Sequence, residues 1–363
     1  MKIGIDASNI RTGGGKSHLI NFINYSLQND SKISFVLVSN IDILTAFKDN
    51  ERVKLCTNFL LNSFNILSFL SQLVLSYKYF KKNNCNVVFV PGGIFISKFR
   101  PFFTMSQNMI PFDNETINRF DFINRIKFHL IKQLQVKTFL DSSGVVFLNE
   151  YAKQIILNNI KHNINYKIIN HGIQKQSQNN YKFSSQPFKI LYVSDFLPYK
   201  HNYKVAKAVS DLILEGEDIS LTLIGKRDKK EFKKINRLIH SNNLLKKRIK
   251  VLGALKHQEV LNQYKDASLF LFASTCENQP IIILEALSHG LPIISSNRGP
   301  MKYMISGSNV LFDSYENEDI KQIILKNMDI EKLNIISKKN FSLSKEYDLD
   351  KSAKDTLEFI KSI

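Results

Sequence analysis

The chain has 363 residues, which at roughly 100–200 residues per domain predicts two domains, each large enough to bury its own core. Apolar residues make up 44% and charged residues 23%, with 14 Gly and 8 Pro, and this composition excludes a disordered or fibrous chain. Fifty Lys and Arg against 32 Asp and Glu give a net charge of +18, which is spread over both halves. Such a balance favours anionic partners, namely nucleotide phosphates, lipid headgroups or nucleic acid.

Cysteine usage and hydropathy indicate a cytoplasmic protein. Cys56, Cys85 and Cys276 are far apart, which predicts reduced thiols and neither a disulfide framework nor a zinc site. The N-terminus becomes polar by Asp6, which leaves no room for the apolar core of a signal peptide. The most apolar window, residues 59–80, is interrupted by Asn, Ser and Gln, so we expect no transmembrane helix.

Short apolar runs alternate with helical patterns along the whole chain, and each run predicts a buried parallel strand. In order, the runs are Lys2–Asp6, Ile33–Val38, Asn86–Val90, Phe102–Met105, Val145–Leu148, Phe188–Val193, Leu221–Ile224, Ile249–Leu252, Leu269–Ala273 and Pro292–Ser295. This alternation predicts two doubly wound α/β domains, residues 1–172 and 188–345. Residues 173–187 lack an apolar period and are the predicted linker, and residues 346–363 are the predicted closing helix.

A glycine run follows the first predicted strand. Gly13, Gly14 and Gly15 stand just before a helical pattern, so strand, glycine loop and helix start predict an anion-binding corner. The glycines let backbone N–H groups approach an oxyanion closely. A turn without a ligand is the alternative, and the spacing matches neither the dinucleotide-binding fingerprint nor the phosphate-binding loop.

The segment from Ser274 to Gly290 is the most informative one. Pro280 suits a first helical turn and Gly290 a helix stop, so we expect a helix that begins just after Glu277. Its free N–H groups predict a phosphate site. Glu285 lies about 7–8 Å beyond Pro280 along the helix axis, and this distance is close to the span from a diphosphate to a ribose. The alternative is that Glu285 is a surface helix residue and Glu277 a cap.

Several segments together resemble one family. They are Glu277 with seven residues to Glu285, the following Ala286–Asn297, the glycines 13–15, Val145–Ala152, Ile169–Ile173, Leu191–Ser194 and Pro198–Lys200. Taken in their order along the chain, they are similar to GT4-type retaining glycosyltransferases, the glycosyl transferases group 1, which have the GT-B fold. The resemblance implies two Rossmann-like domains that face a central cleft, with the acceptor bound by the first domain and a nucleotide-sugar donor by the second.

The resemblance also implies site residues. Lys200 is expected to contact the donor diphosphate, Glu277 the transferred sugar and Glu285 the ribose. Backbone N–H groups complete the predicted donor site at Gly14, Gly15, Asn278, Gln279, Ile281 and Ile282. No cofactor and no metal are expected, because cations and helix dipoles would stabilise the leaving diphosphate. The one Asp-x-Asp pattern, Asp348 to Asp350, is interpreted as a helix cap.

Three positions depart from the family pattern, and at one of them Tyr303 replaces a common Glu. Asp195 stands where the family usually has a basic residue, and Lys226 or Arg227 is the predicted substitute. Gln107 stands where the family often has His-Asp, and an amide can hydrogen-bond a hydroxyl but cannot act as a base. His171 is a third catalytic candidate beside Glu277 and Gln107, with a hinge residue as its alternative role.

Two basic stretches remain. The run from Lys226 to Lys250 is interpreted as a solvated helix face. Residues 120–140 mix basic and apolar side chains, which suits either a core helix or an interfacial helix at an anionic membrane.

The sequence therefore predicts a hexosyltransferase-type enzyme that moves a sugar from a nucleotide-sugar donor to a glycan acceptor. A lipid-linked acceptor, surface polysaccharide or lipopolysaccharide synthesis, and peripheral attachment to the inner face of the cytoplasmic membrane are further expectations. Two alternatives stay open. One is a sugar-nucleotide epimerase or phosphorylase with the GT-B fold, and the other is a basic nucleic-acid-binding protein without enzymatic activity, for which no Lys/Arg–aromatic motif is present.

Overall fold

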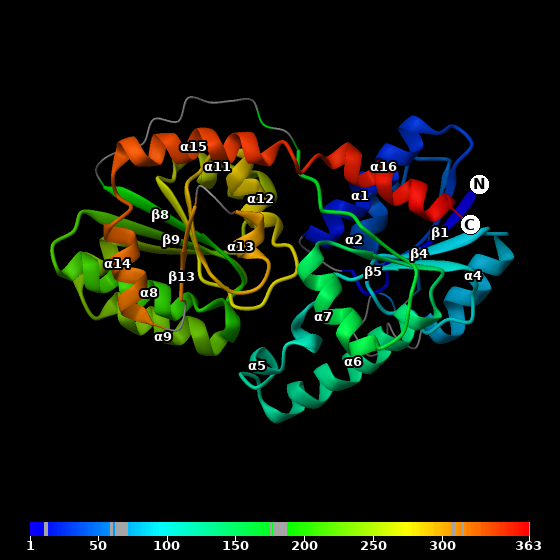
Figure 1. Ribbon diagram of the computed structural model, residues 1–363, viewed down its shortest axis with the longest axis horizontal. Helices are drawn as coiled ribbons and strands as arrows, with labels where there is room; N and C mark the ends of the chain where they lie inside the picture. Colours follow the sequence, from blue (N-terminus) through cyan, green and yellow to red (C-terminus); the bar gives the residue numbers. More distant parts are fainter. Residues whose placement is uncertain are drawn as a thin grey trace. The chain divides into compact units, whose positions relative to one another are not determined.

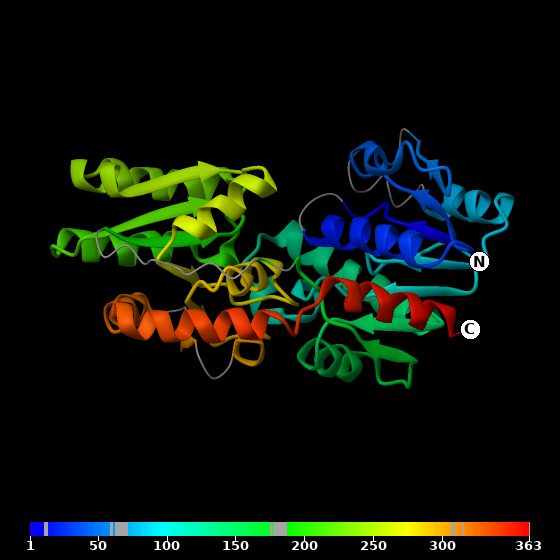
Figure 2. The same ribbon diagram turned by 90° about the horizontal axis from the view of Figure 1, so that it is seen from above.

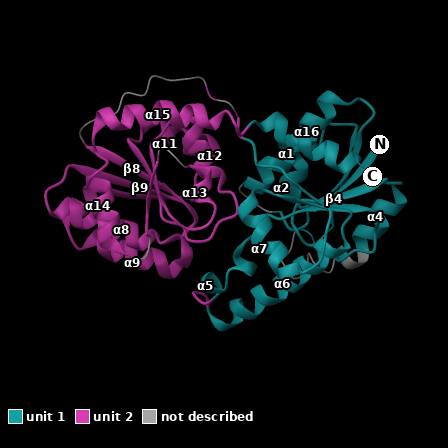
Figure 3. Ribbon diagram, viewed as in Figure 1, with its two compact units in different colours: residues 1–117, 121–172, 348–363 teal, residues 118–120, 173–347 magenta. Residues whose placement is uncertain are grey.

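The computed structural model describes residues 1–10, 14–58, 61, 72–174, 176, 187–305, 309–313 and 316–362. The chain divides into two compact units (Figure 3). The first unit comprises residues 1–117, 121–172 and 348–363, and the second comprises residues 118–120 and 173–347. Gly172, the predicted end of the first domain, is the last residue of the first unit before the chain passes into the second. Most of the predicted linker, residues 173–187, lies outside the described residues.

The first unit is built on a parallel seven-stranded sheet in the order β3-β2-β1-β4-β5-β6-β7. Its strands are β1 (Lys2–Asp6), β2 (Ser34–Val38), β3 (Val53–Cys56), β4 (Val87–Val90), β5 (Phe102–Met105), β6 (Gly144–Phe147) and β7 (Tyr166–Ile168). The central strands are buried along their full length, as expected where helices cover both faces of a parallel sheet.

Helices flank this sheet and include the end of the chain. They are α1 (Gly14–Asn29), α2 (Ile41–Leu44), α4 (Tyr77–Lys82), α5 (Asn114–Ile117), α6 (Phe122–Asp141), α7 (Glu150–Ile160) and α16 (Leu349–Lys361). The predicted closing helix is α16, and it lies beside α1 in both views (Figure 1, Figure 2). Leu357 and Ile360 of α16 join the same buried cluster as Leu19 and Phe22 of α1, so the C-terminal helix completes the core of the first unit.

The second unit has a parallel six-stranded sheet in the order β10-β9-β8-β11-β12-β13. Its strands are β8 (Phe188–Val193), β9 (Ile219–Ile224), β10 (Ile249–Gly253), β11 (Leu269–Phe272), β12 (Ile293–Ser296) and β13 (Val310–Phe312). Helices pack on both faces, in two separate buried clusters. The helices are α8 (Asn202–Leu214), α9 (Lys229–His240), α10 (Asn243–Arg248), α11 (His257–Asp266), α12 (Ile281–Ser288), α13 (Met301–Met304), α14 (Asn317–Leu325) and α15 (Ile330–Ser344).

The predicted α/β class with two doubly wound parallel sheets is confirmed. The sequence missed three strands, β3, β7 and β13, and all three lie at the edge of a sheet. An edge strand is short and half exposed, so it lacks the apolar run by which the central strands were found. Among the described residues, no helix is both long and apolar enough to span a bilayer.

Candidate functional site

Two predicted site residues meet at the carboxyl ends of β8 and β11. Lys200 closes a 3₁₀ turn, Pro198–Lys200, after β8, and Glu277 follows β11. The Lys200 ammonium donates to Oε1 of Glu277 in an ion pair whose side chains are only 12% and 13% exposed. The carboxyl ends of parallel strands are where doubly wound sheets bind ligands. The structure therefore brings the expected diphosphate contact and the expected sugar contact to one point.

Aromatic rings surround the ammonium group of Lys200. It lies 5.0 Å from the ring centre of Tyr199 and 5.6 Å from that of Phe272, within the range of cation–π attraction. Burial alone would lower the pKa of Lys200, but the Glu277 carboxylate and the two neighbouring tyrosines hold it above its ordinary value. Burial also raises the pKa of Tyr199 to about 12. Lys200 is thus a permanent buried cation, the group that a leaving diphosphate needs.

Hydrogen bonds tie together the two loops that carry this pair. The N–H of Thr275 donates to the Tyr199 carbonyl at 3.0 Å, and His201 Nε2 lies 3.3 Å from Thr275 Oγ1. The Tyr192 hydroxyl donates to the Lys200 carbonyl. Because backbone and side-chain bonds fix both loops, Lys200 and Glu277 are held in place before any ligand binds.

Helix α12 begins later than the sequence predicted. It starts at Ile281, not just after Glu277, and Pro280 is its extended N-cap with φ −71° and ψ 110°. A residue that precedes proline disfavours the helical region, which explains why Gln279 cannot open the helix. The predicted stop is confirmed, since α12 ends at Ser288 and Gly290 adopts φ +67°.

The first turn of α12 presents backbone N–H groups that the helix itself cannot satisfy. Ile281 and Ile282 form this turn and are half buried, and Asn278 and Gln279 are buried in the loop before it. The four predicted backbone contacts of the second unit therefore lie in the loop after Glu277 and in the first turn of α12. This geometry suits an oxyanion at the N-terminus of α12.

Two side chains of α11 hold Glu285. His257 Nε2 lies 2.7 Å from Oε1 of Glu285, and the Tyr264 hydroxyl donates to Oε2 at 3.2 Å. The Glu285 side chain is 13% exposed, so the alternative of a plain surface residue is wrong. The hydrogen bond to Glu285 raises the pKa of His257. The pKa of Tyr264 is raised mainly by burial and, to a smaller extent, by the nearby Glu285 carboxylate. No sequence pattern pointed to either partner, because each is distant from Glu285 along the chain.

The loop after β9 is hydrogen-bonded to Asp195, the position where a basic residue was expected. The backbone N–H of Lys226 donates to Asp195 Oδ1 at 2.8 Å, so this carboxylate is engaged in holding the loop. Gly225 permits the approach, since its φ is +148° and a Cβ there would lie 2.0 Å from the Ser194 carbonyl oxygen. Of the two predicted substitutes, the Lys226 side chain is exposed. The Arg227 guanidinium donates to the Val251 carbonyl at 2.7 Å and stacks on Phe232.

The first unit brings together another group of predicted residues. Gly14 and Gly15 open α1, whereas Gly13 lies outside the described residues. A Cβ on Gly15 would lie 2.7 Å from Oε1 of Gln107, so only glycine lets the Gln107 amide approach the start of α1 this closely. Gln107 Nε2 also lies 3.2 Å from the Met105 sulfur.

His171 is buried in the first unit against a second histidine that the sequence interpretation missed. The ring centres of His18 on α1 and His171 lie 4.8 Å apart. Burial lowers the pKa of His18 to about 4, and burial together with His18 holds that of His171 well below its usual value. Both rings are therefore neutral near pH 7.

The Asp-x-Asp pattern caps a helix. The Asp348 side chain accepts a hydrogen bond from the Lys351 N–H at 2.9 Å at the start of α16, which confirms the capping interpretation. Over the part of the chain that the structure describes, no group of three or more His, Cys, Asp or Glu side chains is arranged to hold a metal ion.

Comparison with known proteins agrees with this arrangement. Residues 173–341 match the model of the family described as glycosyl transferases group 1. Residues 173–341 therefore form a glycosyl transferases group 1 domain. The match contains Lys200, Glu277, Glu285 and the whole of α12, so the family assignment and the geometry concern the same part of the chain.

The group 1 domain and the first unit together have the GT-B fold of known glycosyltransferases. The structure of WaaG, a glycosyltransferase involved in lipopolysaccharide biosynthesis, is similar over 100% of this chain and 100% of the WaaG chain, with a TM-score of 0.76 at 12% identity. The structure of Anabaena Alr3699/HepE in complex with UDP-glucose covers 100% of this chain and 99% of its own, with a TM-score of 0.74 at 15% identity.

A curated relative matches over a shorter stretch. Protein CapJ of Staphylococcus aureus is 31% identical over 110 residues, which are 29% of this chain and 26% of CapJ. The chain spans about a quarter to two fifths of the length of the curated relatives it matches.

Proposed function

We propose that the protein is a retaining glycosyltransferase that moves a hexosyl group from a nucleotide-sugar donor to a glycan acceptor. The observation that carries this proposal is the buried Lys200–Glu277 pair beside the N-terminus of α12, inside the group 1 domain. The pair couples a permanent cation to a carboxylate that can accept hydrogen bonds from hydroxyl groups. The HepE structure, which holds UDP-glucose in the same fold, supports a nucleotide sugar as the donor.

Each candidate site residue of the second unit has a role in the proposed reaction. As the bond between the sugar and the diphosphate breaks, negative charge grows on the leaving oxygen, and Lys200 with the N–H groups at Ile281 and Ile282 stabilises it. Glu277 accepts hydrogen bonds from the sugar hydroxyls. Glu285, held by His257 and Tyr264, accepts them from the ribose diol. Because these cationic and dipolar groups supply the positive charge, we propose that transfer needs no divalent metal.

The first unit would bind the acceptor. Gln107, His18 and His171 offer neutral hydrogen-bonding groups at the start of α1, and an amide or a neutral imidazole can both donate to and accept from a sugar hydroxyl. We propose Gln107 and His171 as acceptor contacts, with the N–H groups of Gly14 and Gly15 directed at the donor phosphate.

Helix α6 supports a lipid-linked acceptor and peripheral attachment to an anionic membrane. Its first half exposes large apolar side chains, with Phe122 75%, Ile123 78%, Ile126 46% and Leu130 55% exposed. Arg125 and Lys127 stand between them and are also exposed. The core-helix alternative holds only for the second half, where Gln135, Thr138 and Phe139 are buried. Exposed apolar residues interleaved with basic ones are typical of a helix that lies in a membrane interface.

The test is an activity screen with mass analysis of the products. The protein is incubated with UDP-, GDP-, ADP- and dTDP-sugars, with and without a lipid-linked glycan acceptor, in EDTA or in Mg²⁺. We expect an acceptor heavier by one hexosyl group, a free nucleoside diphosphate and equal yield in EDTA. An isomerised nucleotide sugar in the absence of acceptor would instead show an epimerase, and dependence on inorganic phosphate would show a phosphorylase.

A further inference from the structure

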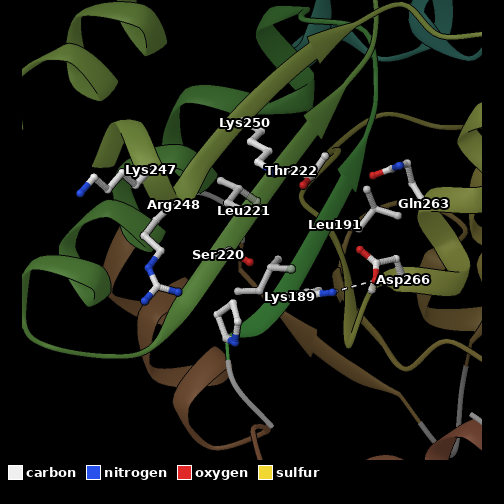
Figure 4. A pocket seen from close by; sticks show the side chains of 13 residues that line it. Lys189, Leu191, Ser220, Leu221, Thr222, Lys247, Arg248, Lys250, Gln263 and Asp266 are labelled. Atoms are coloured by element: carbon white, nitrogen blue, oxygen red, sulfur yellow. Dashed lines mark hydrogen bonds and ion pairs between the residues drawn. The ribbon is translucent and has the colours of Figure 1, made fainter. Parts of the chain in front are cut away.

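The second unit has a hollow at the amino ends of its strands, away from Lys200, Glu277 and α12. It encloses about 220 Å³ between the first residues of β8, β9 and β10 and the last turn of α11. Figure 4 shows the side chains that line it. None of the residues assigned above to the donor or acceptor lines this hollow, so the proposed function does not explain it.

Strand register builds a polar floor for the hollow. Lys189 of β8 lies opposite Ser220 of β9, and Thr222 of β9 lies opposite both Leu191 of β8 and Lys250 of β10. Because side chains alternate between the two faces of a strand, these residues share one face. The residues between them, such as Ile190 and Leu221, enter the buried cluster on the other face. The alternation of β9 and β10 thus leaves hydroxyl and ammonium groups where a covered parallel strand would carry apolar ones.

Charge in the hollow is positive and only partly balanced. Lys189 is paired with Asp266 at 2.7 Å, as the dashed line in Figure 4 marks, and Arg248 is paired with Asp218 at 2.7 Å. Within the described residues, no carboxylate lies within ion-pair distance of Lys247 or Lys250. Two ammonium groups are therefore available to an anion, beside the hydroxyls of Ser220 and Thr222.

We propose that this hollow binds a phosphate ester. A phosphate group has several oxygens that accept hydrogen bonds from different directions. The hollow offers such donors in the hydroxyls of Ser220 and Thr222 and the ammonium of Lys250. Gln263 and Asp266 offer amide and carboxylate groups to hydroxyls on the carbon side of the ester. Among the described residues that line the hollow there is no aromatic ring, so these residues offer a nucleobase no stacking surface, which argues against a nucleotide or single-stranded nucleic acid.

The phosphate ester could be free in solution or belong to a lipid headgroup, and two probes distinguish these sources. The first is glucose 6-phosphate, titrated by calorimetry in the presence of saturating UDP at a constant ionic strength set by chloride. The second is a vesicle of neutral lipid that contains phosphatidic acid, assayed by sedimentation. Binding of phosphate at α12 is distinguished by the variants described next, which alter the hollow and leave α12 unchanged, so the inference stands whether or not the protein transfers sugars.

Matched variants locate the binding. Lys250→Gln and Thr222→Val each alter the floor, whereas Lys233→Gln removes the same charge from the exposed face of α9. We expect saturable binding of one probe that weakens about tenfold in Lys250→Gln and in Thr222→Val and less than about twofold in Lys233→Gln. Thermal unfolding checks that all variants remain folded. The proposal is overturned if neither probe binds saturably, or if Lys233→Gln weakens binding as much as Lys250→Gln does.

Discussion

Lys200 and Glu277 form a buried ion pair across 77 residues of sequence, and each is the other's charge partner in the second unit. The arrangement keeps a cation and a carboxylate at the ends of β8 and β11 without an unpaired buried charge. A nucleotide sugar would bring a diphosphate for the cation and hydroxyl donors for the carboxylate. Without a ligand, the protein thus already holds both groups in the positions where a donor would contact them.

Removal of one partner of this pair should destabilise the second unit. Glu277→Ala leaves the Lys200 ammonium buried without a counter-charge, and we expect the free energy of unfolding to fall by about 3 kcal/mol. The double variant Lys200→Met/Glu277→Leu removes both charges and should recover most of this loss. Urea unfolding measures both, with Glu217→Ala, an exposed position, as the control. A loss no larger than that of Glu217→Ala would mean that the pair is solvated.

The contact of His257 with Glu285 should be visible as a titration. The hydrogen bond to Glu285 raises the pKa of His257 above 6.5, and Glu285→Gln removes the negative charge that causes this. Histidine NMR signals followed against pH should show the His257 pKa fall toward 6.5 in Glu285→Gln. The sign also fixes the effect on stability, because a raised pKa stabilises the fold below pH 6.5 and this contribution disappears as the pH rises through the folded pKa. An unchanged titration of His257 in Glu285→Gln would show that the two side chains are not in contact.

The buried histidine pair should make the first unit sensitive to acid. His18 and His171 have lowered pKa values, so the unfolded chain binds more protons than the folded one below about pH 6.5. Stability should therefore fall as the pH falls from 6.5 toward 4, by about 1.4 kcal/mol per pH unit for each proton.

A histidine variant isolates this effect. Asp6, whose pKa burial raises, contributes with the opposite sign in acid, so the slope of the wild type alone is not diagnostic. His18→Leu should reduce the slope by about one proton, and His162→Leu, at an exposed position, should leave it unchanged. Equal slopes for the wild type and His18→Leu would show that His18 titrates normally.

Helix α6 should control attachment to anionic vesicles. Phe122→Ser/Ile123→Ser removes two exposed apolar side chains, each worth about 1.5–3 kcal/mol when fully buried, so we expect vesicle binding to fall at least about tenfold. The matched control is Tyr303→Ser/Ile335→Ser, which changes two exposed large apolar side chains of the second unit. Binding should also weaken as salt rises. Equal sedimentation with neutral and anionic vesicles would favour a soluble acceptor.

Much of the sheet architecture could be predicted from the sequence because parallel strands inside a doubly wound sheet are apolar on both faces. Phe102–Met105 and Phe188–Val193 were predicted with the bounds that the structure has. Tyr166–Ile168 was missed, since an edge strand with two exposed residues reads as a loop. The helix start at Ile281 was placed too early, because the pattern does not show that Pro280 itself is extended.

The candidate site was predictable only as far as motif spacing reaches. Spacing pointed to Glu277 and Glu285 and the family resemblance pointed to Lys200, but neither predicted that Lys200 and Glu277 pair with each other. His257 and Tyr264 were missed because tertiary packing alone places α11 against Glu285, which lies 28 and 21 residues from them along the chain. His18 was missed for the same reason, since only tertiary packing places its ring against that of His171.

Calorimetric titration of the protein with UDP, GDP, ADP and dTDP tests the central claim, that the second unit binds a nucleotide at Lys200, α12 and Glu285. We expect one of the four nucleotides to bind saturably, with affinity reduced at least about tenfold in Glu285→Ala, which loses the ribose contact. Glu259→Ala, an exposed carboxylate on the neighbouring helix α11, should bind as the wild type does. Absence of saturable binding for all four nucleotides, or equal affinity in Glu285→Ala and the wild type, would contradict the account.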